Sequence, residues 1–138
     1  MAKKSAIRIE KDIYDVLVNA LSGIIGGTVY KEGCRPLNAT TEDAVVIVSG
    51  GDAEQIQTGR AHVNIYVPDI DNGNGNFVED KERLTELSDH DATIVEALNE
   101  CLFEEYSFRL YSMTETFSEP DIHQNFVNVN LEFDRITF

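Results

Sequence analysis

The sequence predicts an α+β domain in which two helices cover one face of a mostly antiparallel sheet of about five strands. The expected order is α-β-β-β-α-β-β. Two segments repeat apolar residues at the helical period, and the last strand alternates apolar with polar residues. Short connections between strands favour antiparallel pairing. With 138 residues, 42% of them hydrophobic, residues 1–138 are expected to form one domain around one core.

The first predicted element is a helix that ends at Gly26 and Gly27. Glycine readily adopts the positive φ that ends helices. Asp12 and Asp15 are expected near its start, where carboxylates stabilise the positive end of the helix dipole. Its apolar stripe at helical spacing consists of Ile13, Val16, Leu17, Ala20, Leu21 and Ile24.

Three strands are expected next. Residues 28–31 predict a short strand, and the β-branched run 44–48 predicts a strand buried on both faces or nearly so. A polar hairpin loop is expected at Gly51–Gly59. The strand at residues 60–67 alternates, with Ala61, Val63, Ile65 and Val67 toward the core.

A second helix is expected from Glu79 to Cys101. Asp91 interrupts its apolar stripe, so residues 88–91 are expected to be exposed or to kink the helix. Two strands, at 107–117 and 127–134, follow, with a turn at 118–121. Four residues of the alternating strands are expected between sheet and helices: Val63, Ile65, Val129 and Leu131.

The charge balance narrows the classes of function. Lys plus Arg number 11 and Asp plus Glu number 25, a formal charge of −14. Such a surface repels nucleic acid and argues against sequence-reading DNA binding. The acidity suits solubility, a basic partner or a wall that does not hold DNA. No apolar run reaches the roughly 20 residues of a membrane helix, and no signal peptide is predicted, so we expect a cytoplasmic origin and no membrane partner.

The segment 69–80 partly matches a calcium-binding loop. Asp69, Asp71 and Asp80 occupy positions 1, 3 and 12 of the EF-hand template. The template then requires a ligand followed by glycine, but Gly73 and Asn74 stand in the reverse order. We therefore expect a flexible, metal-free loop.

No set of residues predicts an enzyme. His62, His90 and His123 fall in different predicted elements, and no nucleophile motif or phosphate-binding loop accompanies them. Cys34 and Cys101 are expected to be a loop thiol and a helix-end thiol, both reduced. We expect no catalytic residues and no cofactor.

The third strand carries the candidate contact surface. Its wetter face presents aromatic, amide and cationic groups, which suit protein interfaces, and an ordinary solvated sheet face is an equal alternative. The adjoining loops 50–59 and 69–76 are also expected to make contacts. The candidate subunit-interface residues are Arg60, His62, Asn64, Tyr66, Asp69 and Asp71.

The order of these elements resembles a known family. A helix containing Asp12-Ile13-Tyr14-Asp15-Val16-Leu17 leads through Gly26-Gly27-Thr28-Val29-Tyr30 into the first strand; the strands 44–48 and 61–67, a long helix and two last strands follow. Over nearly the whole chain this resembles the small tail-terminator or tail-completion proteins of long-tailed phages and prophages. The resemblance implies a homo-oligomeric ring, commonly of six subunits, that caps the tail tube and meets the head connector. It implies a structural protein of the virion tail, assembled in the host bacterial cytoplasm.

The charge is consistent with such a ring. A lumen through which DNA passes without specific binding is expected to be negative, because attraction to phosphates would slow passage. The alternatives are a head–tail connector (neck) subunit, a small ligand-binding module and an unrecognised hydrolase. The oligomeric state distinguishes virion assembly from a monomeric ligand module.

Overall fold

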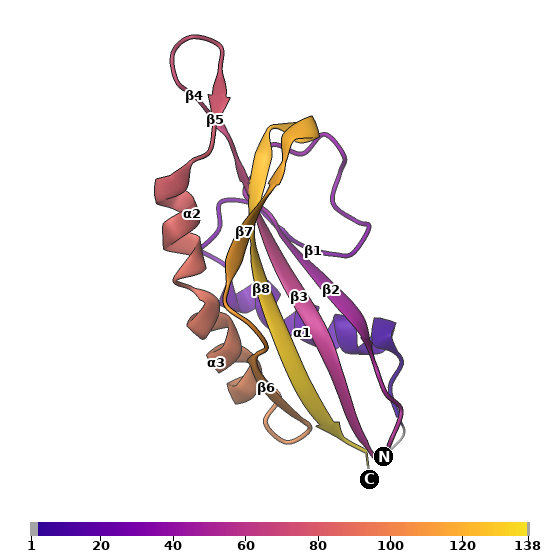
Figure 1. The fold of residues 1–138 in the computed structure, drawn as a ribbon. Coiled ribbons are helices and arrows are strands. Elements are labelled where there is room, and N and C mark those ends of the chain that lie inside the picture. The colour runs from indigo at the N-terminus through magenta and orange to yellow at the C-terminus, as the bar shows by residue number, and fades with distance from the viewer. Residues whose placement is uncertain (1–2, 138) are drawn as a thin grey trace.

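Two layers make up the fold, with all the helices on one side of a six-stranded sheet (Figure 1). The computed structural model describes residues 3–137. The predicted α+β class is confirmed. The elements are α1 (Ala6–Ala20), β1 (Val29–Lys31), β2 (Ala44–Gly51), β3 (Ile56–Pro68), β4 (Ile70–Asp71), β5 (Phe77–Val78), α2 (Lys81–Ser88), α3 (Asp91–Cys101), β6 (Tyr106–Leu110), β7 (Glu115–Glu119), the 3₁₀ turn η1 (Pro120–Ile122) and β8 (Gln124–Ile136).

The long strands β3 and β8 form the centre of the sheet. The strand order is β1-β2-β3-β8-β6, and β7 also pairs with β8. Only β1 and β2 are parallel; the other neighbouring strands of this sheet are antiparallel. Because β6 and β7 pair with successive parts of β8, they extend one edge of the sheet in two steps.

The core lies between the sheet and the helices. Val63, Ile65, Val129 and Leu131 are completely buried, which confirms the predicted facing of both central strands. They belong to one apolar cluster with side chains from every helix: Ile13, Leu17, Leu84, Leu87, Ile94 and Leu98.

Helix α1 begins earlier than its stripe predicted. The side chain of Ser5 caps it by accepting a hydrogen bond from the Arg8 N–H, at 3.4 Å. The expectation that Asp12 and Asp15 lie near the start was therefore wrong, because Ile9 extends the buried face by one turn. Asp12 instead accepts hydrogen bonds from Lys4 at 2.6 Å and from the Tyr106 hydroxyl at 2.7 Å.

The second predicted helix is two helices. The helical conformation is interrupted at Asp89 and His90. The prediction of a single helix from Glu79 to Cys101 was therefore wrong, while the predicted irregularity at residues 88–91 was correctly placed. One straight helix would place Asp91 on the same face as Leu87 and Ile94; with the break, these two apolar residues are buried while Asp91 is half-buried.

The observed strand boundaries differ from those that the sequence patterns predicted. Strand β2 ends at Gly51 and strand β3 begins at Ile56, so the loop between them is shorter than predicted and consists of residues 52–55. The close approach of these strands requires glycine, since a Cβ at Gly59 would lie 2.6 Å from the Gly50 carbonyl oxygen. The predicted strand 107–117 is interrupted at 111–114, and the turn after it is η1, followed by His123 in the left-handed region at φ 54°.

The segment predicted as a flexible loop forms the two-stranded hairpin β4–β5. Ile70 pairs with Val78 and Asp71 with Phe77. The Asp71 carboxylate accepts hydrogen bonds from the N–H groups of Gly73, at 2.8 Å, and Gly75, at 3.1 Å. Figure 1 shows the hairpin projecting beyond one end of the sheet, and we call residues 69–79 the arm.

Candidate subunit-contact surfaces

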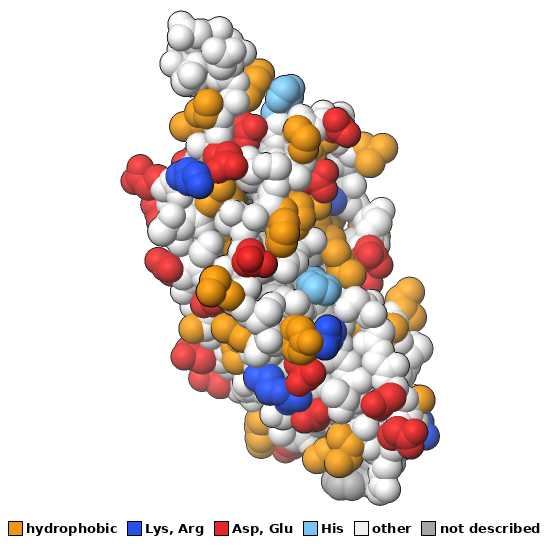
Figure 2. Space-filling view, in the orientation of Figure 1, with side chains coloured by type: hydrophobic (Ala, Val, Ile, Leu, Met, Phe, Trp, Pro, Cys, Tyr) orange, Lys and Arg blue, Asp and Glu red, His pale blue; other side chains and the backbone are white. Residues whose placement is uncertain are grey.

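One face of the sheet has no helix over it. Arg60, His62, Asn64 and Tyr66 alternate with the buried residues of β3 and therefore lie on this open face, as predicted. Figure 2 views the molecule from the same side as Figure 1, in which α1 runs behind the sheet, and shows hydrophobic, acidic and basic side chains interspersed. The open face is thus mixed in character, and its local geometry decides which residues are available.

Asn64 is not available for contact. Its side chain is buried, with 9% of the residue exposed, and its amide oxygen accepts a hydrogen bond of 2.7 Å from Asn128. The Asn128 nitrogen also lies 3.3 Å from Nδ1 of His62. The prediction of an exposed Asn64 was wrong because Asn128 is directly opposite on β8. These groups form an amide cluster that stabilises the pairing of the central strands.

Tyr66 is held under Arg35. The guanidinium lies 4.4 Å from the centre of the Tyr66 ring, and Phe126 packs 5.1 Å from it. Arg35 is itself fixed by hydrogen bonds of 2.9 Å to Asp43 and to Gln124. Burial, with a contribution from the nearby carboxylate of Glu119, raises the pKa of Tyr66. Its ring is therefore part of a packed cluster and only partly exposed.

The exposed aromatic surface lies at the β7 side of the open face. Phe117 packs on Phe126 with ring centres 5.6 Å apart, and nearly half of Phe117 is exposed. Tyr111 is exposed to the same degree, and Arg60 stacks 3.3 Å from its ring centre. The sequence reading missed this surface because it placed Tyr111 and Phe117 in one uninterrupted strand.

A charge cluster occupies the lower part of the open face. Arg109 donates hydrogen bonds to Glu132 at 2.5 Å and to Asp134 at 3.1 Å. Asp134 also accepts from the Thr58 hydroxyl at 2.8 Å. The hydrogen bonds from Thr58 and Arg109 lower the pKa of Asp134. One cation thus offsets part of the negative charge of these two carboxylates.

The two predicted aspartates of the arm have structural roles. Asp69 accepts a 2.8 Å hydrogen bond from the Asn125 amide at the base of the arm, and Asp71 shapes its turn. The arm instead exposes three apolar side chains, Ile70, Phe77 and Val78, each exposed by at least 40%. The pair Phe77-Val78, directly after the Asn/Gly run, is the sequence signal that would have revealed this surface.

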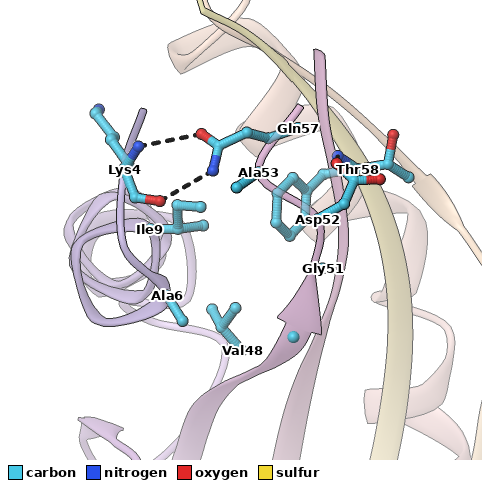
Figure 3. Close-up of a pocket in the computed structure, with 11 residues that line it drawn as sticks. Lys4, Ala6, Ile9, Val48, Gly51, Asp52, Ala53, Gln57 and Thr58 are labelled. Atoms are coloured by element: carbon cyan, nitrogen blue, oxygen red, sulfur yellow. Dashed lines mark hydrogen bonds between the residues drawn. The ribbon is translucent and has the colours of Figure 1, made fainter. Parts of the chain in front are cut away.

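A small pocket lies at the other end of the sheet, between the start of α1 and the β2–β3 turn (Figure 3). Its volume is about 220 Å³. Roughly 300–1,000 Å³ is usual for a small-molecule site, so this pocket suits a single side chain better than a metabolite. Its lining includes Lys4, Ala6, Ile9, Val48, Gly50, Gly51, Asp52, Ala53, Gln57, Thr58 and Phe133.

The described residues contain no cluster of metal ligands, and their two cysteines are free. Within residues 3–137, no three His, Cys, Asp or Glu side chains gather closely enough to hold a metal ion. Cys34 lies in a loop and Cys101 at the end of α3, and both are exposed and free. The three histidines stay in separate places: His62 on β3, His90 before α3 and His123 after η1. No helix in the described part of the chain is long and apolar enough to cross a bilayer.

Comparisons with known proteins identify no family. No family model matches the chain, and no curated protein matches it. One solved structure is similar over 97% of both chains, with 14% sequence identity and a TM-score of 0.46. A similarity this distant carries no functional information.

Proposed function

We propose that this chain is a structural subunit of a phage tail, of the tail-terminator or tail-completion kind. It associates with copies of itself into a ring at the head-proximal end of the tail tube. The ring contacts the tube on one side and the head connector on the other. DNA passes through it without specific binding.

The observation that carries this proposal is the uncovered sheet face with its exposed aromatic edge. A domain with helices on only one side of its sheet leaves the other side for solvent or for a partner. Here that side exposes Phe117 and Tyr111, and the neighbouring Met113 is exposed as well. Aromatic residues and methionine are enriched at protein interfaces relative to other surfaces.

The distribution of charge also supports a ring around DNA. Residues 79–105, which include α2 and α3, contain ten acidic and two basic residues, a net charge of −8 out of the total −14. A wall with this charge repels phosphates, so DNA would slide past it. The order of elements, which resembles that of tail terminators, gives the proposal its particular place in the virion.

Sedimentation velocity with purified tail tube tests the proposal. We expect the protein to associate with itself and to bind the tube end, and Phe117→Ser to weaken at least one of these contacts. The matched control is Val18→Ser, because Val18 is an exposed apolar residue on α1, away from both the open face and the start of that helix.

Three outcomes would count against the proposal. A monomer at every salt and protein concentration that ignores the tail tube would overturn it, as would tight DNA binding at physiological salt. A subunit that binds a head connector and not the tube would instead be a neck protein.

A further inference from the structure

The arm presents apolar side chains that its own domain does not bury. Its strands pair through two residue pairs only, and a hairpin this small is not stable alone in water. The base is fixed by a 2.9 Å hydrogen bond from the Asp69 N–H to the His123 carbonyl, and Phe77 stacks 4.5 Å from the His123 ring. A fixed, projecting element with an exposed apolar surface is suited to insertion into a partner.

The pocket between α1 and the β2–β3 turn has the size of one aromatic ring. An apolar cavity of about 150 Å³ is known to accept benzene, and this pocket offers about 220 Å³. Gly50 and Gly51 contribute no side chains to its wall, while Ile9, Val48 and Phe133 give it apolar surface.

The polar groups around the pocket are already used within the chain. The Gln57 side chain accepts from the Lys4 N–H at 3.1 Å and donates to the Lys4 carbonyl at 3.0 Å, as Figure 3 shows. The Thr58 hydroxyl donates to Asp134, and Asp52 accepts from the Thr58 N–H at 3.2 Å. The pocket therefore favours an apolar occupant over a polar one.

The arm cannot fill the pocket of its own chain. The arm follows the Pro68 end of β3 (Figure 1). The pocket lies at the end of β3 that begins with Ile56. Strand β3 has 13 residues, which at roughly 3.3 Å per residue span about 40 Å. An occupant from this protein must therefore come from another copy.

The charges at the two ends are complementary. Residues 69–82, at the arm, contain five carboxylates and one lysine. Residues 3–11, which border the pocket, contain four basic residues and one glutamate; Lys4 pairs with Asp12 and Glu105, and Lys11 pairs with Asp15, while Lys3 and Arg8 are exposed. The rest of the chain is strongly acidic, so the exposed cations Lys3 and Arg8 give an acidic arm attraction at this end of the molecule.

We infer that the arm of one copy docks at the pocket of a second copy, and that Phe77 leaves its stack on His123 to enter that pocket. This contact joins two different surfaces, so each subunit still has a free arm or pocket, and repetition closes a ring or extends a filament. The inference rests on the self-association proposed above and names the surfaces that make it.

Two variants test the two sides of the contact, the arm and the pocket, independently. Phe77→Ser removes the inserted ring, and Ala53→Trp fills the mouth of the pocket from an exposed turn position. Each variant alone is expected to associate about tenfold more weakly or worse, the effect of losing a central aromatic anchor. Mixed together, they are expected to form a dimer that does not grow, since the first keeps its pocket and the second keeps its arm. Phe103→Ser is the control, because Phe103 is 72% exposed and belongs to neither surface.

A pair of charge variants tests the electrostatic part. Glu79→Lys with Glu82→Lys reverses charge at the end of the arm and directly after it, and is expected to weaken association. Glu96→Lys with Glu100→Lys makes the same change in net charge on the exposed side of α3 and is expected to leave association unchanged or to strengthen it.

The results distinguish the inference from the proposed function. Wild-type association that Phe77→Ser and Ala53→Trp leave intact, or variants that do not pair on mixing, would overturn the arm–pocket contact but not the tail-subunit proposal. Near-ultraviolet circular dichroism on each variant shows that a lost contact is not a lost fold. A wild-type protein that never associates would overturn both.

Discussion

Val63 and Val129 lie directly opposite each other on the two central strands, and both are completely buried. They belong to the apolar cluster that is buried between the sheet and the helices. Val129→Asp places an unpaired carboxylate there, and we expect a loss of several kcal/mol, comparable with the whole stability of a domain this size. Chemical denaturation measures the loss. Ile136→Asp on the exposed end of the same strand is the control, and a small effect at position 129 would contradict the assigned core.

The loss of folding stability at acid pH, the acid limb of the curve of stability against pH, is expected to depend on Glu105. Burial opposes its ionisation, but hydrogen bonds from Lys4 and Arg135 and their positive charges outweigh it and lower the pKa of Glu105 from 4.5. Between its folded pKa and about pH 4.5, the unfolded chain therefore binds more protons than the folded one, so this stabilisation is present above about pH 4.5 and is lost as pH falls through the folded pKa. Urea denaturation from pH 7 to pH 3 should show it.

Glu105→Gln is expected to lower stability at pH 7 and to flatten that acid limb. Glu104→Gln, at an exposed neighbouring position, is the control. An acid limb that is equally steep in Glu105→Gln would assign the effect to other carboxylates, of which Glu42 is the first to test. The pKa of Glu42 is also lowered, because hydrogen bonds from Arg83 and from the Gly26 N–H outweigh its burial.

The arm is expected to bind calcium no more tightly than millimolar. One oxygen of Asp71 already accepts two backbone N–H groups, and Asp69 accepts from Asn125, so the carboxylates that the EF-hand template would use are engaged in the hairpin. Calorimetric titration checks this directly. A saturable micromolar site that Asp71→Ala abolishes would contradict the expectation.

The sequence predicted those features that depend on local alternation. Val63 and Leu131 were placed in the core because period two in a strand assigns its faces whatever lies opposite. The break before α3 is harder, since the pattern marks only the misfit of Asp91, and packing against the sheet decides whether a helix bends, frays or stops there.

The contact surfaces depend on residues far apart in the chain, which explains what was missed. Asn64 is buried because Asn128, 64 positions later, lies opposite it. The pocket joins the start of α1 to the β2–β3 turn and Phe133, and no local pattern brings these together. The exposure of Phe77 likewise follows from the projection of its hairpin beyond the sheet.

Self-association is expected to increase with salt. Each subunit carries a formal charge of −14, of which residues 79–105 contribute −8, so approaching copies repel each other before any contact forms. At 0.1 M salt the screening length is about 10 Å, so added salt relieves this repulsion between whole subunits. Salt also weakens the attraction between the arm and residues 3–11, but burial of apolar groups such as Phe77 does not depend on that attraction.

We therefore expect mainly monomer at low salt and a rising sedimentation coefficient between 0.05 and about 0.5 M, a range over which the screening length falls several-fold. The less acidic variant Glu96→Lys with Glu100→Lys should associate at a lower salt concentration than the wild type. Association that falls steadily with salt would mean that charge attraction, and not apolar contact, holds the subunits together.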